Sequence, residues 1–181
     1  MTKADKKYQF RQESLQRLNR ISWMNGYAKD KKIMKVLYRL ITQDNGKSVM
    51  LYLPLKLEVN LYPLILKLRK EKRNLYVPFM EGKSFRLVKY RLPLRKKQFG
   101  IKEPNDSKQY RKRSIDIAIV PVVGVDSMYK RVGFGKGMYD RFFEKERHHI
   151  QKTIFIAREL CYAPEEITDG YDIRADMIIT A

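Results

Sequence analysis

The feature that most restricts the fold of this chain is a run of mainly β-branched apolar residues at positions 115–123, Ile-Asp-Ile-Ala-Ile-Val-Pro-Val-Val. The run is shorter than most helices, and its composition favours a strand. A strand that is apolar on both faces is typical of the centre of a parallel sheet, where other elements cover both sides. We therefore expect this run to be a central strand of an α/β protein.

Helical and extended segments alternate along the rest of the chain. Apolar residues at helical spacing predict helices near residues 5–20, 33–41 and 61–68, and the glycine-rich turn at residues 133–137 predicts a further helix at 138–147. β-rich segments predict strands at residues 48–53, 74–77, 84–90, 153–157 and 177–180, the second of them ending at Pro78. Residues 91–113 are expected to form a long surface loop, and Trp23 is expected in the core. This order predicts a single-domain α/β fold over residues 1–181 with a mostly parallel sheet.

The charge of the chain is strongly positive. It has 39 Lys and Arg residues against 20 Asp and Glu, a formal net charge of +19 over 181 residues. Such a charge suits a protein that binds the phosphates of nucleic acid, or an enzyme whose small substrates carry several negative charges. A surface made soluble by many Lys residues would give the same composition. Composition alone leaves these three interpretations open.

The sequence gives no indication of export or of a membrane span. No run approaches the roughly eighteen apolar residues that cross a bilayer, and residues 1–20 are polar where a signal peptide would be apolar. The single cysteine, Cys161, has no intramolecular disulfide partner. We expect a soluble cytoplasmic protein with no membrane partner.

Three glycines at alternate positions, Gly133, Gly135 and Gly137, follow the apolar strand and precede a predicted helix. Glycines let the backbone approach a ligand closely, and the amides at a helix start attract phosphate. Arg131 and Lys136 add positive charge there, and the nearby Asp140 is a possible ligand for the magnesium that accompanies a nucleotide. The spacing is neither that of a Walker A loop nor that of the dinucleotide fingerprint, so a simple tight turn is the alternative interpretation.

The residues around these glycines carry a more specific resemblance. Residues 131–141, read together with the strand at 115–121, closely resemble the 5-formyltetrahydrofolate cyclo-ligase family, also called methenyltetrahydrofolate synthetase. Further motifs that are similar to those of the family appear in family order at residues 7–11, 52–59, 76–78, 100–104 and 171–180. The resemblance spans nearly the whole chain.

The resemblance implies a three-layer α/β/α fold and a monomeric enzyme that uses ATP and Mg²⁺ to convert 5-formyltetrahydrofolate into 5,10-methenyltetrahydrofolate, with release of ADP and phosphate. It implies metal ligands at Asp140 and Asp172, and folate contacts at Leu53 and Glu58. The implied ATP contacts are Lys7, Tyr8, Gln9, Phe10, Arg11, Arg131, Val132, Gly133, Phe134, Gly135, Lys136, Gly137, Met138 and Tyr139.

This chemistry accounts for the residue types in the motifs. A formamide oxygen is a poor leaving group, so it must become a phosphate ester before the N10 nitrogen can close the ring. Phosphoryl transfer depends on alignment and charge neutralisation more than on a side-chain nucleophile. Arg131 and Lys136 are accordingly interpreted as phosphate stabilisers, and no other catalytic residue is singled out. A basic nucleic-acid-binding protein remains the alternative from another class, and an ATP-dependent enzyme with a different acceptor is a further one; with the cyclo-ligase activity, no nucleic-acid partner is expected.

Overall fold

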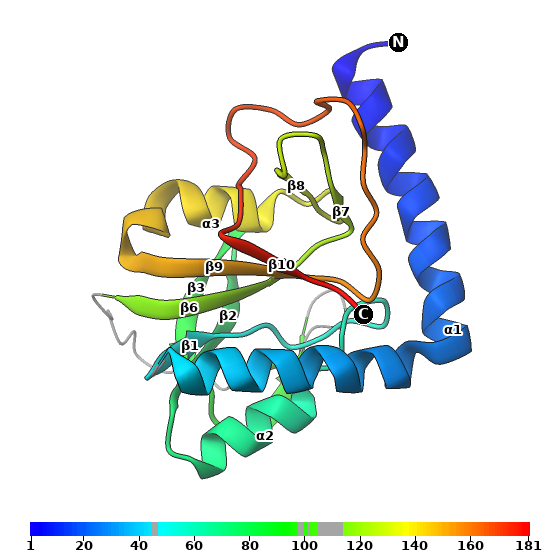
Figure 1. Cartoon of the computed structure of the whole chain (residues 1–181). Coiled ribbons are helices and arrows are strands. Elements are labelled where there is room, and N and C mark those ends of the chain that lie inside the picture. The colour runs from blue at the N-terminus through cyan, green and yellow to red at the C-terminus, as the bar shows by residue number, and fades with distance from the viewer. Residues whose placement is uncertain (45–46, 98–99, 101, 105–113) are drawn as a thin grey trace.

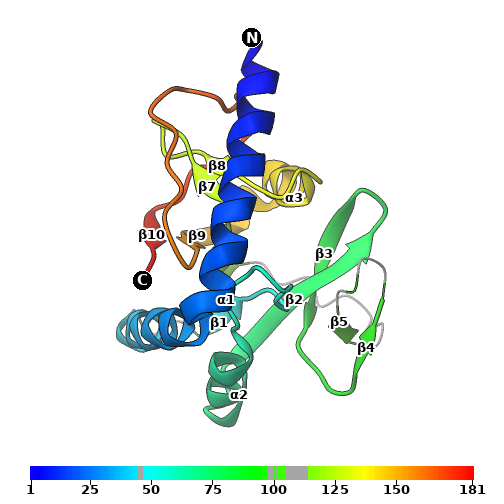
Figure 2. The same ribbon diagram turned by 90° about the vertical axis from the view of Figure 1, so that its right-hand side faces the viewer.

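The computed structural model of the chain describes residues 1–44, 47–97, 100, 102–104 and 114–181 (Figures 1 and 2). Its centre is a six-stranded sheet in the order β10-β9-β6-β1-β2-β3, in which only β2 and β3 pair antiparallel. These strands are β1 (Ser48–Met50), β2 (Asn74–Glu81), β3 (Ser84–Lys89), β6 (Ile115–Pro121), β9 (Ile150–Ile156) and β10 (Met177–Ile179). The predicted α/β class with a mostly parallel sheet is confirmed.

The predicted central strand is β6, which lies between β9 and β1. Its side chains alternate between two apolar cores. Ile117 and Ile119 pack into the core on one face of the sheet, and Ala118 and Val120 pack into the core on the other. All four are at most 1% exposed, which explains why the run is apolar on both faces.

Helices cover both faces of the sheet. Helix α1 (Lys3–Gln43) bends at Asn25, where φ is −151° and ψ is 24°, so it has a first arm (residues 3–24) and a second arm (residues 26–43) that run in different directions (Figure 1). The second arm and α2 (Tyr62–Lys70) bury apolar residues in one core, and α3 (Met138–Glu146) buries Phe142 and Phe143 in the other. The result is the three-layer arrangement that the family resemblance implies.

The first arm of α1 lies beyond the sheet, at the side where the parallel strands end. It packs against the hairpin of β7 (Gly124–Val125) and β8 (Arg131–Val132) and against residues 157–176, which connect β9 to β10 (Figure 1). Lys3 forms an ion pair with Glu166 at 3.0 Å, and Lys7 contacts Asp169 at 3.2 Å. The amino end of α1 is closed by a capping box between Thr2 and Asp5.

Strand β2 does not end at Pro78, as the sequence suggested, but continues to Glu81. The carbonyl of Tyr76 accepts the N–H of Leu51 at 2.8 Å, so Tyr76 and, two residues later, Pro78 turn their backbone polar groups away from β3. The register of β1 on β2 ends at Tyr76. An N–H at position 78 would therefore have had no strand to donate to. The missing N–H of Pro78 costs no strand pairing, and the pairing of β2 with β3 continues past it.

Two other expectations were wrong. The predicted loop at residues 91–113 contains two short paired strands, β4 (Leu94–Lys96) and β5 (Lys102–Pro104), although its residues 105–113 lie outside the described part. Trp23 is 81% exposed at the bend of α1 and is no part of the core. A 3-10 turn (Arg147–His149) links α3 to β9. None of the helices in the described ranges is long and apolar enough to cross a membrane.

Candidate active site

A cavity of about 340 Å³ lies where the parallel strands end, and we call it the sheet-edge cavity. Its walls come from the first arm of α1, the segments that follow β1, the end of β2, the glycine turn with the start of α3, and the 157–176 connection. Elements far apart in the sequence meet there because parallel strands bring their carboxyl ends to one edge of a sheet.

The glycine turn leads directly into α3. Gly135 and Gly137 have φ angles of +93° and +61°, in the region that favours glycine, and Gly137 is the N-cap of α3. A Cβ atom on Gly133 would clash with the guanidinium of Arg131. Among the residues that the structure describes, no side chain caps the start of α3, which leaves the amino end of the helix facing the cavity without a side-chain acceptor. The glycines thus make a tight turn that also has the form of an anion-binding site.

Arg131 is held rigidly at the wall of the cavity. It is 4% exposed, and its Nε donates to the carbonyl of Pro121 at 3.1 Å. The guanidinium lies 4.8 Å above the centre of the Tyr139 ring, and one of its terminal nitrogens is 3.6 Å from Asp140 Oδ2. Nearby, Arg11 Nε donates to the carbonyl of Gly133 at 2.8 Å. Two guanidinium groups are therefore fixed beside the glycine turn.

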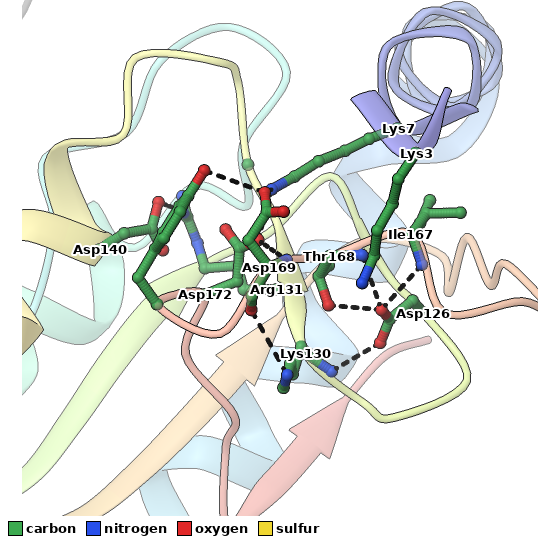
Figure 3. Close-up of polar contacts among 12 residues, drawn as sticks. Lys3, Lys7, Asp126, Lys130, Arg131, Asp140, Ile167, Thr168, Asp169 and Asp172 are labelled. Carbon is green, nitrogen blue, oxygen red and sulfur yellow. Dashed lines mark hydrogen bonds and ion pairs between the residues drawn. The ribbon is translucent and has the colours of Figure 1, made fainter. Parts of the chain in front are cut away.

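Lys7 is bound by the 157–176 connection (Figure 3). Its ammonium donates to the carboxylates of Asp169 and Asp172, and the Asp172 carboxylate also accepts the N–H of Asp169 at 2.7 Å. Burial alone would lower the pKa of Lys7, but the hydrogen bonds and charges of Asp172 and Asp169 outweigh burial and raise it. Lys7 is thus a charged donor at the cavity wall.

Asp140, in the first turn of α3, is a largely buried acid whose side chain is 11% exposed. Burial raises its pKa; the charge of Arg131 opposes this shift and that of Asp172 adds to it. Its Oδ1 atom is buried and has no hydrogen-bond partner among the described residues. A buried carboxylate oxygen without a partner, with a second carboxylate nearby, fits a magnesium ion.

A complete protein cage for a metal is absent from the described part of the chain, which contains no cluster of three His, Cys, Asp or Glu side chains that could hold an ion. Magnesium in nucleotide sites commonly takes one or two carboxylates and completes its coordination with phosphates and water. Asp140 and Asp172 both line the cavity and are the residues that would supply those carboxylates.

Glu58 lies in the turn that follows β1 and lines the cavity. Its Oε2 accepts the N–H of Leu55 at 2.7 Å, which folds the side chain back over the turn. Burial raises the pKa of Glu58 to about 7, against the opposing effects of the Leu55 hydrogen bond and the charges of Arg131 and Arg158. Leu53, which is 5% exposed, contributes apolar surface beside it.

The motifs and this geometry agree with the comparison to known proteins. The family model described as "5-formyltetrahydrofolate cyclo-ligase family" matches residues 3–181. The chain belongs to this family. It is 26% identical to the 5-formyltetrahydrofolate cyclo-ligase of Haemophilus influenzae, over 94% of this chain and 95% of that protein. It is 29% identical to the one of Mycoplasma genitalium, over 83% and 82% of the two chains.

Solved structures give the same result. The NMR structure of the Aquifex aeolicus 5,10-methenyltetrahydrofolate synthetase matches with a TM-score of 0.80 at 29% identity, covering 96% of this chain and 89% of that one. The Mycoplasma pneumoniae 5,10-methenyltetrahydrofolate synthetase matches with a TM-score of 0.72 at 26% identity, covering 96% and 97%. The chain is an enzyme of this ligase family, and the resemblance in its motifs is confirmed.

Most residues that the cyclo-ligase motifs single out line one cavity. These are Lys7, Arg11, Leu53, Glu58, Arg131, Gly133, Phe134, Gly135, Lys136, Gly137, Met138, Tyr139, Asp140 and Asp172. Four others face elsewhere. Tyr8 is 61% exposed, Gln9 donates to Glu13 at 2.9 Å, and Phe10 and Val132 pack together in a small core.

The cavity also has lining residues that the sequence motifs did not assign. They are Tyr52, Leu55, Pro78, Met80, Phe85 and Tyr171. Tyr52, Leu55, Pro78 and Tyr171 lie within the segments that resemble the family, so their position in those segments was the signal that could have found them. Met80 and Phe85 come from the β2–β3 hairpin, whose pairing had to be known first.

Proposed function

We propose that this protein, as one domain over residues 1–181, converts 5-formyltetrahydrofolate into 5,10-methenyltetrahydrofolate while ATP becomes ADP and phosphate. The observation that carries the proposal is that one cavity contains both a glycine turn with fixed cations beside it and a half-buried acid, Glu58, on a separate turn. The first set suits the phosphates of ATP, and the second suits the N–H groups of a pterin. The family's name and those of its relatives agree with this substrate.

In the first step, the formyl oxygen attacks the γ-phosphorus of ATP, the bond to the β-phosphate oxygen breaks, and ADP leaves. Arg131, Arg11 and the amides of the glycine turn hold the phosphates in line and spread their charge. Lys136 is an additional cation on the same turn. Magnesium bound by Asp140 and Asp172 would neutralise further phosphate charge.

In the second step, the N10 amine attacks the formyl carbon, which the phosphate ester has made electrophilic. A nitrogen–carbon bond forms, N10 gives up its proton, and the carbon–oxygen bond breaks. Phosphate leaves with the electron pair of that bond and takes up the proton. Glu58 contributes by orienting the pterin, because its carboxylate accepts hydrogen bonds from ring and amino N–H groups. Apolar walls from Leu53, Pro78 and Phe85 exclude water from the activated carbon.

The test is a product assay. Purified protein is mixed with 5-formyltetrahydrofolate, ATP and Mg²⁺, and the near-ultraviolet absorbance of the methenyl product is followed together with ADP release. We expect product only when ATP and the metal are both present. No ATP-dependent product would overturn the proposal, and product from other formylated amines in place of folate would favour a different acceptor.

We further propose that the enzyme works as a monomer in the cytoplasm. A cytoplasmic location agrees with the need for ATP, and a monomer agrees with a cavity whose walls all come from one chain. Size-exclusion chromatography with light scattering tests the oligomeric state. A stable dimer would contradict the proposal.

A further inference from the structure

A second hollow, which we call the bend groove, lies against the bend of α1. It has a volume of about 580 Å³ and is bordered by Trp23, Tyr27, Lys56 and Arg158. Leu55 and Glu58 line both this groove and the sheet-edge cavity, so the two spaces adjoin across one turn of the chain.

The bend groove exposes aromatic side chains. Trp23 is 81% exposed and Tyr27 is 82% exposed, although both carry large apolar rings. A pair of exposed rings beside a hollow is typical of a binding groove rather than of an ordinary surface. Met24, between them, is also exposed at 77% but does not line the groove, so it provides a matched control at the same bend.

The floor of the bend groove is built rigidly. Arg158 donates to both carboxylate oxygens of Asp30, at 2.7 and 2.9 Å, and both side chains are buried. Arg158 also donates to the carbonyl of Leu57 at 3.3 Å, and Asp30 accepts the N–H of Asn60 at 3.1 Å. This ion pair therefore fixes the turn that separates the two spaces. Arg158 also neutralises the negative charge of Asp30, so the Asp30 carboxylate does not repel an anion in the groove.

The sheet-edge cavity has to accept parts of two large substrates. Its volume of about 340 Å³ is near the lower limit of the roughly 300–1,000 Å³ that pockets for single ligands have. Phosphates are expected beside the glycine turn and Lys7, whereas the bend groove adjoins the cavity at Glu58, where the pterin is expected. The part of the folate beyond the pterin, an aromatic amide of glutamate, is therefore the group that would reach the groove.

We propose that the bend groove binds the benzoyl-glutamate tail of the folate substrate, with Trp23 and Tyr27 against the aromatic ring and Lys56 at the glutamate carboxylates. The proposal rests on the proposed function and extends it to a new subsite. Lys56 is exposed and forms no ion pair with a described residue, so its ammonium is available to an anion.

The first test compares two substrates in steady-state assays. One is 5-formyltetrahydrofolate, and the other is 5-formyl-6-aminomethyl-tetrahydropterin, which keeps the N10 nitrogen and lacks the tail. We expect Trp23→Ala and Lys56→Glu each to raise KM for the folate about 3- to 10-fold, with little change in kcat or in KM for ATP. With the tail-less substrate both variants should match the wild type, and Met24→Ala should match it with both substrates.

The second test is independent of turnover. Trp23 is the only tryptophan of the chain, so its emission reports on this groove alone. Binding of 5-formyltetrahydrofolate should shift the emission maximum to shorter wavelength, because the ring leaves water, whereas the tail-less compound should not shift it.

The outcomes separate the two proposals. If the wild type turns over folate but the Trp23 and Lys56 variants are unaffected, or are affected equally with both substrates, the groove is not the tail site. An unshifted Trp23 emission at saturating folate would exclude the groove in the same way. If the wild type neither binds nor turns over folate, the proposed function is wrong, and so is the proposal that the folate tail occupies the bend groove.

Discussion

At the scale of single residues, Asp140 is a buried acid whose charge is only partly compensated. Burial raises its pKa, and Oδ1 has no hydrogen-bond partner among the described residues. We expect Asp140→Asn to lower kcat about 100-fold, because the variant loses the proposed magnesium ligand at the proposed site of phosphoryl transfer. The melting temperature of the metal-free protein should stay the same or rise, because an acid with a raised pKa costs stability once it ionises.

The control for Asp140 lies on the same helix. Glu144 is exposed in α3 and does not line the sheet-edge cavity, so Glu144→Gln should leave kcat and the melting temperature near their wild-type values. Calorimetry without nucleotide or metal, together with the product assay, provides both measurements. Full activity of Asp140→Asn would remove this residue from the site.

Glu58 makes a separate prediction about pH. Its pKa of about 7 lies above the ordinary glutamate value of 4.5. Between pH 4.5 and 7, Glu58 is therefore protonated in the folded protein but ionised in the unfolded chain. The stability that the neutral form contributes is therefore full below about pH 4.5 and declines as pH rises through 7. Glu58→Gln should flatten that part of the stability profile, measured by urea denaturation from pH 5 to 8.

The same residue should affect catalysis in the opposite direction. A carboxylate accepts pterin N–H groups better than a carboxylic acid does, so kcat/KM for folate should rise with pH through an inflection near 7. In Glu58→Gln that inflection should vanish, while KM for ATP should change little. An unaltered inflection in the variant would assign the titration to another group.

Which motif residues reach the cavity was only partly predictable from the sequence. Lys7 and Arg11 are four residues apart and share one face of α1, so both line the cavity. Tyr8, Gln9 and Phe10 lie between them and necessarily turn to other sides of the helix. The residues of a strand alternate in the same way, so Val132 points away from the cavity that Arg131 lines.

At the scale of elements, the Asp30–Arg158 pair joins the bend of α1, the Glu58 turn and the end of β9. Both partners are at most 7% exposed, so removing one leaves a buried charge. We expect Arg158→Met to destabilise the protein by about 3–5 kcal/mol in urea denaturation, and Asp30→Leu combined with Arg158→Met to recover much of the loss. Because the pair fixes the Glu58 turn, kcat/KM for folate should fall more than that for ATP.

A surface ion pair provides the comparison for the buried Asp30–Arg158 pair. Arg17 and Glu159 contact each other with side chains that are 52% and 27% exposed. Glu159→Gln should cost less than about 1 kcal/mol, because water screens the pair. If Arg158→Met lowered the free energy of unfolding by an equally small amount, the Asp30–Arg158 pair would contribute little to the stability of the fold.

Helices and strands were predictable from the sequence where a local pattern determines them. They were not predictable where the bounds or exposure of an element depend on a neighbouring element. The second arm of α1 and helix α2 follow from apolar spacing alone, and α3 follows from the glycine turn before it. The extent of β2 depends on β1 ending beside Tyr76, so that Pro78 has no partner in β1 while its pairing with β3 continues. The exposure of Trp23 depends on the direction that α1 takes after Asn25, and neither neighbour relation is written in the local sequence.

At the scale of the whole molecule, one apolar strand implied the layers, because a strand buried on both faces requires cover on both. The positions of the positive charges were not predictable, since they depend on which edge of the sheet each helix end reaches. Helix α2 ends just before β2 begins, so Lys70 lies at the edge opposite the sheet-edge cavity. Arg39 lies near the end of α1, and α1 ends just before β1 begins. Arg39 is therefore also at the edge opposite the sheet-edge cavity. Part of the +19 charge is therefore remote from the proposed site.

This distribution predicts how salt acts on the enzyme. At about 0.1 M salt, charges more than roughly 10 Å apart are largely screened, so only cations near the cavity should affect ATP binding at physiological ionic strength. Lys136→Gln should raise KM for ATP and weaken its dependence on potassium chloride between about 0.02 and 0.3 M. The combined variant Arg39→Glu and Lys70→Glu should leave KM for ATP unchanged at about 0.15 M. If the distant pair had the larger effect, the net charge of the molecule, and not the turn that carries Lys136, would govern how the nucleotide is gathered.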